Sequence, residues 1–217
     1  ESGEDINTSL DKFERSTEAT EVSQDNNSLG DIMADIFDEL ESGKMIDKVK
    51  TGIPIIDKCT NGIAPSELVT IGAKSGVGKS ALAVRIAINM YKADKKILIV
   101  SREMSKKQVA ERILLSHSGI SKEQYENRDF NDEQWVRIVE TMEAFSGEGI
   151  IIDDKISTIQ EIKQAIRRSK PDVLIVDYVQ LLTPSNPRDS RERQVAEISR
   201  ELKKMTSDFD MIVIQLT

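Results

Sequence analysis

The chain has 217 residues, 38% of them hydrophobic and 31% charged, which suits one domain with an ordinary core plus an appended segment. Its net charge of −8 is concentrated in residues 1–45, which hold 13 Asp and Glu but 3 Lys and Arg, so the rest is nearly neutral and could present a basic surface to nucleic acid. The single cysteine and single histidine exclude an internal disulfide and argue against a Cys/His zinc site, and no run approaches the roughly 20 apolar residues of a membrane-spanning helix.

The first 44 residues divide into two parts. Residues 1–27 are polar and acidic without periodicity, which predicts a disordered or linker tail that carries no signal peptide. Residues 28–44 predict one amphipathic helix, because their apolar side chains recur at helical spacing and form one stripe. A short helix cannot bury such a stripe alone. We expect it to dock either on its own domain or on a neighbouring subunit, and the sequence favours neither.

From residue 45 onward, apolar strands alternate with helical patterns. The predicted strands are 68–71, 97–100, 150–152, 173–176 and 211–214, and the predicted helices lie at about 79–92, 105–118, 131–145, 157–169 and 190–208. Such alternation predicts an α/β domain whose mostly parallel sheet is covered by helices on both faces. Trp135 falls on one of these helical patterns and is expected to pack in the core.

A phosphate-binding loop is predicted at residues 73–80, AKSGVGKS, which follow the first strand and open a helix. Except for Ala73 at the first glycine, they match the Walker A pattern G-x-x-x-x-G-K-[ST]. Small residues let backbone N–H groups converge on phosphates, and the helix N-terminus attracts negative charge. A glycine-rich turn with a chance lysine fits this context poorly. The predicted contacts to ATP are Ala73, Lys74, Ser75, Gly76, Val77, Gly78, Lys79, Ser80 and Ala81.

Polar residues at three further strand ends are candidates for the same site. Asp177 ends the strand at 173–176 as a Walker B acid does and, with the Ser80 hydroxyl, is expected to hold Mg²⁺. Glu103 follows the strand at 97–100. It either polarises the attacking water or stabilises a helix start, and the residues favour neither. Gln215 either touches the γ-phosphate or merely ends a strand, and without a relative for comparison the second is favoured.

The segment between residues 182 and 195 has two prolines and several polar residues, so it is predicted to be a loop. Its arginines are candidates to neutralise phosphates of single-stranded DNA. They could equally pair with Asp189 and Glu192 in solvent, which charge balance slightly favours. The DNA-binding candidates are Arg188, Arg191 and Arg193.

In combination these motifs resemble the C-terminal, RecA-like ATPase domain of the DnaB family of replicative helicases, bacterial or phage, over about residues 50–217. The resemblance covers residues 51–57 and 61–68, the loop that begins with alanine, and D-Y-V-Q-L at 177–181. It continues through residues 197–203 and Gln215-Leu216. Residues 101–105, S-R-E-M-S, are similar to the family's S-L-E-M-S, with Arg102 in place of leucine.

The resemblance implies roles for these residues. Glu103 would be the catalytic base, Lys79 and Ser80 would bind phosphate and Mg²⁺, Gln215 would sense the γ-phosphate, and Arg112 would lie near the nucleotide base. It implies a ring of identical subunits, expected to be a hexamer, in which residues 28–44 link neighbours. Single-stranded DNA, a primase and a helicase loader are the further partners, in the cytoplasm of a bacterial or phage-infected cell.

The family's arginine finger and main DNA loop are expected beyond Thr217, and its N-terminal helical domain, which holds the primase contact, is not matched. The chain alone is therefore expected to be a poor ATPase. Two alternatives remain: another RecA-like ATPase, such as a recombinase or a clock-type ATPase, and an ATP-dependent assembly module that does not unwind DNA. A nucleotide kinase is a weaker alternative, because no arginine-rich lid is evident.

Overall fold

In the computed structural model, residues 28–43, 47–74, 76–184 and 186–217 are described. The predicted tail at 1–27 therefore lies outside the described residues, as does Ser75. The chain divides into two compact units, with the boundary at residues 46 and 47. The first contains the helix α2 (Leu29–Glu41), which begins where the Ser28 side chain accepts a hydrogen bond from the Asp31 N–H.

The second unit is built on a five-stranded sheet whose strands all run parallel, as the apolar runs predicted. The strand order is β1-β5-β4-β2-β3, so the α/β fold class is confirmed. The strands are β1 (Leu68–Ile71), β2 (Ile97–Ser101), β3 (Ile150–Asp153), β4 (Val173–Asp177) and β5 (Ile212–Leu216).

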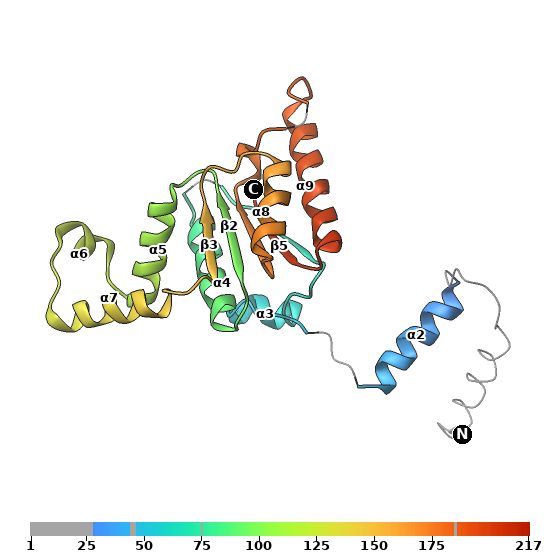
Figure 1. Cartoon of the computed structure of the whole chain (residues 1–217), viewed down its shortest axis with the longest axis horizontal. Coiled ribbons are helices and arrows are strands. Elements are labelled where there is room, and N and C mark those ends of the chain that lie inside the picture. The colour runs from blue at the N-terminus through green and yellow to red at the C-terminus, as the bar shows by residue number, and fades with distance from the viewer. Residues whose placement is uncertain (1–27, 44–46, 75, 185) are drawn as a thin grey trace. The chain divides into compact units, whose positions relative to one another are not determined.

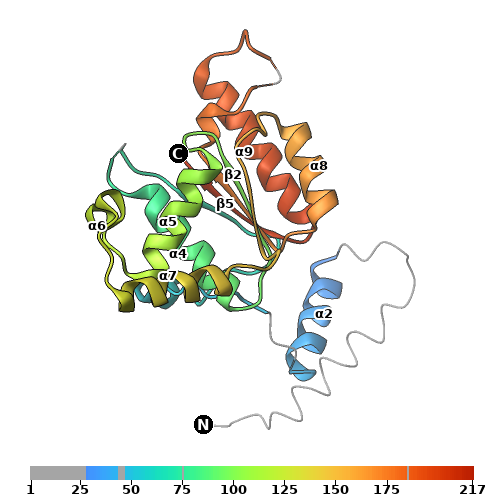
Figure 2. The same ribbon diagram turned by 60° about the vertical axis from the view of Figure 1, so that its left-hand side comes forward.

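Two hydrophobic layers form because successive side chains of a strand point to opposite faces. Ile97 and Ile99 of β2 pack with α4 (Lys79–Lys92) and α5 (Lys106–Ser118), whereas Leu98 and Val100 face α8 (Ile159–Ser169) and α9 (Arg191–Asp208). Figures 1 and 2 show these two pairs of helices on opposite sides of the sheet. The three central strands are buried on both faces, which explains their continuous apolar sequence.

Three short elements appear that periodicity did not predict: α3 (Pro54–Thr60), α6 (Lys122–Asn127) and the 3-10 turn η1 (Val179–Leu181). The expected burial of Trp135 is wrong. It lies on α7 (Asp132–Ala144), is 53% exposed and contacts Phe130 edge to face. The helix α7 packs on α5 rather than on the sheet, so its outward residues have no second layer above them. Among the described helices, none combines the length and apolarity needed to span a bilayer.

Candidate functional site

The loop that joins β1 to α4 has a backbone that requires glycine. Gly76 and Gly78 have φ values of 83° and 100°, a region that side-chain-bearing residues rarely adopt. A Cβ atom added at either position would meet no protein atom within 4 Å, so the space in front of the loop is open. The two glycines therefore shape the loop while leaving room for a ligand.

The start of α4 leaves its first N–H groups available. The helices α5, α6, α7 and α8 each begin with a complete capping box, in which side chains satisfy the first-turn donors. In contrast, α4 begins at Gly78 with no side-chain cap. Unpaired N–H groups and the helix dipole both favour an anion at this position. The start of α4 therefore suits a phosphate group.

Lys79, the first residue of α4, directs its ammonium group toward the ends of neighbouring strands. Its Nζ atom donates a 2.6 Å hydrogen bond to the Thr217 carbonyl, just after β5. The same atom lies 5.4 Å from the centre of the Tyr178 ring, just after β4. The lysine charge is thus held at the carboxyl edge of the sheet.

A hollow of about 610 Å³ opens at this edge and gathers side chains from four segments of the chain. Seven predicted site residues line it: Gly76, Gly78, Lys79, Ser80, Ala81, Glu103 and Arg112. Five other lining residues were not among the predicted site residues, although two of them lie within the D-Y-V-Q-L motif: Met104, Gln108, Tyr178, Gln180 and Thr217. Ala73, Lys74, Val77, Asp177 and Gln215 are not among the lining residues.

Asp177 lies beneath this edge and has an incomplete set of partners. It is 5% exposed, it pairs in register with Ser101 of β2, and its Oδ1 atom is buried without a hydrogen-bond partner. A buried carboxylate oxygen of this kind and the hydroxyl of Ser80 are both oxygen donors, which Mg²⁺ prefers. No group of three or more His, Cys, Asp or Glu side chains suited to a metal occurs in the described part of the chain. The donors therefore fit a Mg²⁺ ion that draws its other ligands from phosphates and water.

Gln215 is held inside the sheet next to this site. It is 4% exposed, pairs with Thr70 of β1 and Val176 of β4, and donates a 2.8 Å hydrogen bond from Nε2 to the Thr70 hydroxyl. Its Oε1 atom is buried and has no partner.

The arginines of the 182–190 loop and the start of α9 differ in their contacts. The Arg191 guanidinium donates to the Gln180 carbonyl and to Oε1 of Gln194, and the Gln194 amide donates to the Asp189 carbonyl. Arg191 is thus bound within the loop. The side chains of Arg188 and Arg193 are exposed, and within the described ranges neither forms an ion pair.

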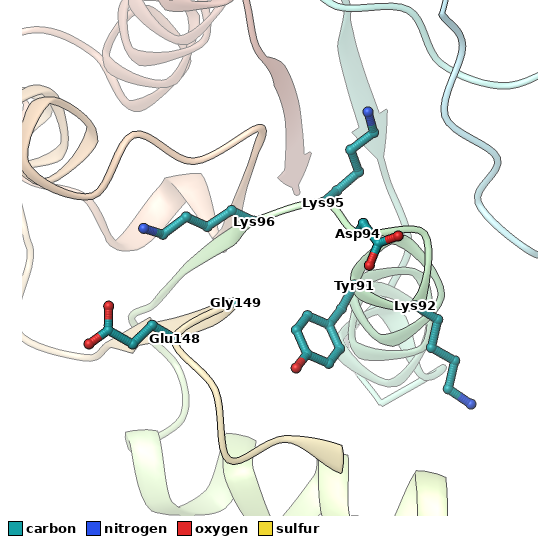
Figure 3. A pocket seen from close by; sticks show the side chains of 7 residues that line it. All are labelled: Tyr91, Lys92, Asp94, Lys95, Lys96, Glu148 and Gly149. Atoms are coloured by element: carbon teal, nitrogen blue, oxygen red, sulfur yellow. The ribbon is translucent and has the colours of Figure 1, made fainter.

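A second hollow lies at the opposite, amino end of β2 and β3 and contains three lysines. Figure 3 shows Lys92, Lys95 and Lys96 pointing in different directions. Lys95 also forms a 3.2 Å ion pair with Asp47. These charges do not converge on one position, so this hollow does not form a phosphate site.

A glycine loop leading to an uncapped helix at the carboxyl edge of a parallel sheet defines a P-loop nucleotide-binding domain. Comparison with known protein families shows to which family of this class the chain belongs. The family model described as "DnaB-like helicase C terminal domain" matches residues 48–217, and the chain belongs to this family.

Individual relatives agree with this assignment. The chain is 31% identical to the replicative DNA helicase DnaB of Geobacillus stearothermophilus, over 99% of this chain and 50% of that protein. It is 30% identical to the replicative DNA helicase DnaC of Bacillus subtilis, over 88% of this chain and 44% of that protein. The chain thus spans about half the length of the curated relatives it matches.

Solved structures show the same fold. A structure described as a DnaB-like replicative helicase and its interactions with primase has a TM-score of 0.79 at 30% identity, covering 97% of this chain and 52% of that chain. A solved ATPase domain has a TM-score of 0.78 at 32% identity, covering 88% of this chain and 71% of that one. The predicted resemblance to the DnaB family and its RecA-like fold is confirmed.

Proposed function

We propose that this chain is the motor domain of a replicative DNA helicase. It hydrolyses ATP with Mg²⁺ at the subunit interfaces of a ring, expected to be a hexamer, and uses the reaction to move along single-stranded DNA and unwind duplex. Membership of the family supports this proposal. The observation that carries it is the single hollow that receives both Lys79 of the glycine loop and Glu103 after β2.

Residues of the hollow and two buried residues next to it, Asp177 and Gln215, take separate tasks in the proposed reaction. Lys79 and the free N–H groups of α4 bind the phosphates. Ser80 and Asp177 hold Mg²⁺, which supplies charge neutralisation at the phosphate oxygens when bound. Glu103 accepts the proton of the attacking water, Gln215 reports the γ-phosphate, and Arg112 lies on the side of the base.

The proposed ring and its DNA contact use surfaces outside the hollow. The helix α2 exposes most of its apolar stripe, including Ile32, Ile36 and Leu40, and we assign this stripe to a second copy of the chain. The exposed arginines Arg188 and Arg193 are assigned to phosphates of single-stranded DNA, with Arg191 in support. Primase and a helicase loader are the further proposed partners, in the cytoplasm of a bacterial or phage-infected cell.

The proposal is tested by Glu103→Gln in the full-length protein with single-stranded DNA present. Glutamine keeps the shape of the side chain but cannot accept the proton, so ATP turnover should fall by about 10²-fold or more while ATP affinity stays within twofold. Glu140→Gln, an exposed change on α7, is the matched control and should leave both unchanged. Turnover is followed by phosphate release and affinity by equilibrium binding of the nucleotide.

Other outcomes separate the alternatives. Equal turnover in Glu103→Gln and wild type would assign the base to another residue and remove the central support. Hydrolysis and strand pairing without unwinding would favour a recombinase-like ATPase. ATP-dependent assembly without hydrolysis would favour a loading module.

A further inference from the structure

The short turn that carries Glu103 is tied to the loop after β3 on both sides of the acid. Before it, Nη1 of Arg102 donates a 2.9 Å hydrogen bond to the main-chain carbonyl of Asp154 and lies 3.5 Å from that of Lys155. After it, the N–H of Lys106 donates a 2.8 Å hydrogen bond to the Asp154 carboxylate. Asp154 therefore holds both flanks of Glu103.

The main chain of the same turn is fixed to the opposite neighbour. The Arg102 N–H donates a 2.6 Å hydrogen bond to the carbonyl of Asp177, the acid that ends β4. Within the turn, the Ser101 hydroxyl and the main chain of Met104 are 2.8 Å and 3.2 Å apart at their two contacts. Arg102 thus bridges the ends of β4 and β3, with β2 between them.

The carboxylate of Glu103 has no such support of its own. Its side chain is exposed to the hollow, and in the part of the chain that the structure describes it has no hydrogen-bond partner. Its position therefore depends on the main chain that carries it, and that main chain depends on Arg102 and Asp154. A general base must lie within hydrogen-bond reach of the water it activates, so a small displacement of the turn lowers the rate.

We propose that Arg102 and Asp154 form a clamp that positions Glu103 for proton transfer, a role that rests on the function proposed for Glu103. Arg102 is a positioning residue and does not reach the nucleotide, because its guanidinium points to the β3–α8 loop. Leucine, which the family pattern has at this position, donates no hydrogen bond. A leucine at this position therefore cannot form the Arg102 half of the clamp.

The packing around Arg102 allows the effect of a mutation on the position of Glu103 to be distinguished from its effect on stability. The Nε atom of Arg102 is buried and has no partner, so a leucine there removes an unsatisfied donor together with the bonds made by Nη1. Removing the unsatisfied donor should stabilise the fold, whereas losing the Nη1 hydrogen bonds should destabilise it. The melting temperature should change little in Arg102→Leu, and a loss of turnover then reports the geometry of Glu103.

The test measures kcat, KM for ATP and melting temperature in the full-length protein with single-stranded DNA. Arg102→Leu and Asp154→Ala should each lower kcat by about tenfold with KM within twofold, because the nucleotide contacts remain. The double variant should be at least as slow as the slower single variant, because Arg102→Leu removes the bond to the Asp154 carbonyl and Asp154→Ala the bond from the Lys106 N–H. Arg102→Lys and Asp154→Asn, which keep a donor and an acceptor, should restore part of kcat. Arg168→Leu, on the exposed side of α8, is the matched control.

Two sets of results would overturn the clamp. One is an unchanged kcat in both Arg102→Leu and Asp154→Ala while Glu103→Gln is inactive. The other is a higher KM at normal kcat, which would place Arg102 in nucleotide binding. If Arg102→Leu fails to fold, Arg102→Lys and Asp154→Ala decide by the same criteria. Failure of the proposed function is distinct, since Glu103→Gln would then hydrolyse ATP as fast as wild type.

Discussion

Two buried oxygen atoms without partners lie on neighbouring strands, one on Asp177 of β4 and one on Gln215 of β5. A buried polar group left unpaired costs about 1–3 kcal/mol, and such groups are rare in folded proteins. Both atoms lie near the carboxyl edge of the sheet, where Lys79 is also held. We interpret them as oxygens kept for a ligand at the expense of the stability of the domain.

Asp177→Asn should therefore separate stability from function. The neutral amide is easier to bury, so the free energy of unfolding without ligand should stay equal or rise by up to about 1 kcal/mol. Loss of the charge should weaken the hold on Mg²⁺, so ATP turnover should fall about 10²-fold and require more Mg²⁺. Melting curves with and without Mg²⁺ and ATP, and turnover against Mg²⁺ concentration, measure these effects. Asp208→Asn, at the exposed end of α9, is the control, and an unchanged Mg²⁺ requirement in Asp177→Asn would refute the assignment.

At the scale of elements, the contact between α5 and α7 includes a hydrogen-bonded histidine, His117. Nδ1 of His117 lies 3.2 Å from the Thr141 hydroxyl, which itself donates to the Arg137 carbonyl. The hydroxyl has one hydrogen, so the histidine must supply the hydrogen of its own bond, and Nδ1–H is assigned from this network. Burial lowers the pKa of His117, and the positive charges of Lys92 and Arg85 lower it further.

This histidine predicts a pH dependence of stability. Because the folded state disfavours the protonated ring, the unfolded chain binds more protons once the pH falls below the ordinary histidine pKa of 6.5. The contribution of His117 is present above that pH and is lost as the pH falls through the lower folded-state pKa. The melting temperature should drop between pH 7 and pH 5, and the drop should be smaller in His117→Gln. Equal drops in both proteins would show that other groups control this range.

Helix and strand predictions succeeded where a segment was long and its pattern clear. All five strands follow from apolar runs, and the three central ones are continuously apolar because they are buried on both faces. The helices α3 and α6 have 7 and 6 residues, too few for a helical period to stand out. Trp135 was misplaced because apolar residues lie on two sides of α7, and the periodicity does not say which side meets the core.

Only the residues of the candidate site that belong to recognisable sequence motifs could be predicted. The glycine loop and Glu103 were found from residue type and position after a strand, and Arg112 from the resemblance to the DnaB family. Glu103, Arg112 and the second half of the loop line one hollow. The hydrogen bonds from Arg102 to Asp154 and from Lys79 to Thr217 join residues 52 and 138 positions apart. A single sequence carries no signal for such contacts, because they depend on the order of the strands in the sheet.

For the whole molecule, the contacts of the three loop arginines divide them into two kinds. Arg188 and Arg193 form no ion pair among the residues that the structure describes, whereas Arg191 joins the loop to Gln180, which lines the hollow. Replacing all three by alanine should weaken binding to single-stranded DNA. The single replacements should distinguish a contact to DNA from a contact within the loop.

Arg188→Ala and Arg193→Ala should each weaken DNA binding, because each removes one charge that pairs with phosphate. Each should also flatten the plot of log affinity against log salt concentration, by about 0.7 for a single strand. Arg191→Ala should leave this slope nearly unchanged, because its guanidinium is occupied within the loop. Fluorescence anisotropy of labelled oligonucleotides across a salt series measures the slopes. An unchanged slope in both Arg188→Ala and Arg193→Ala would exclude this loop as a phosphate contact.

The order of the strands has a consequence for how the domain is made. β5 lies between β1 and β4, although it follows both of them in the sequence. As the chain leaves the ribosome, β1 and the glycine loop that follows it emerge before β5. Until β5 has emerged, β1 lacks the strand with which it pairs. A partly synthesised domain therefore has no finished nucleotide pocket, and ATP can be captured only after β5 and Thr217 have emerged.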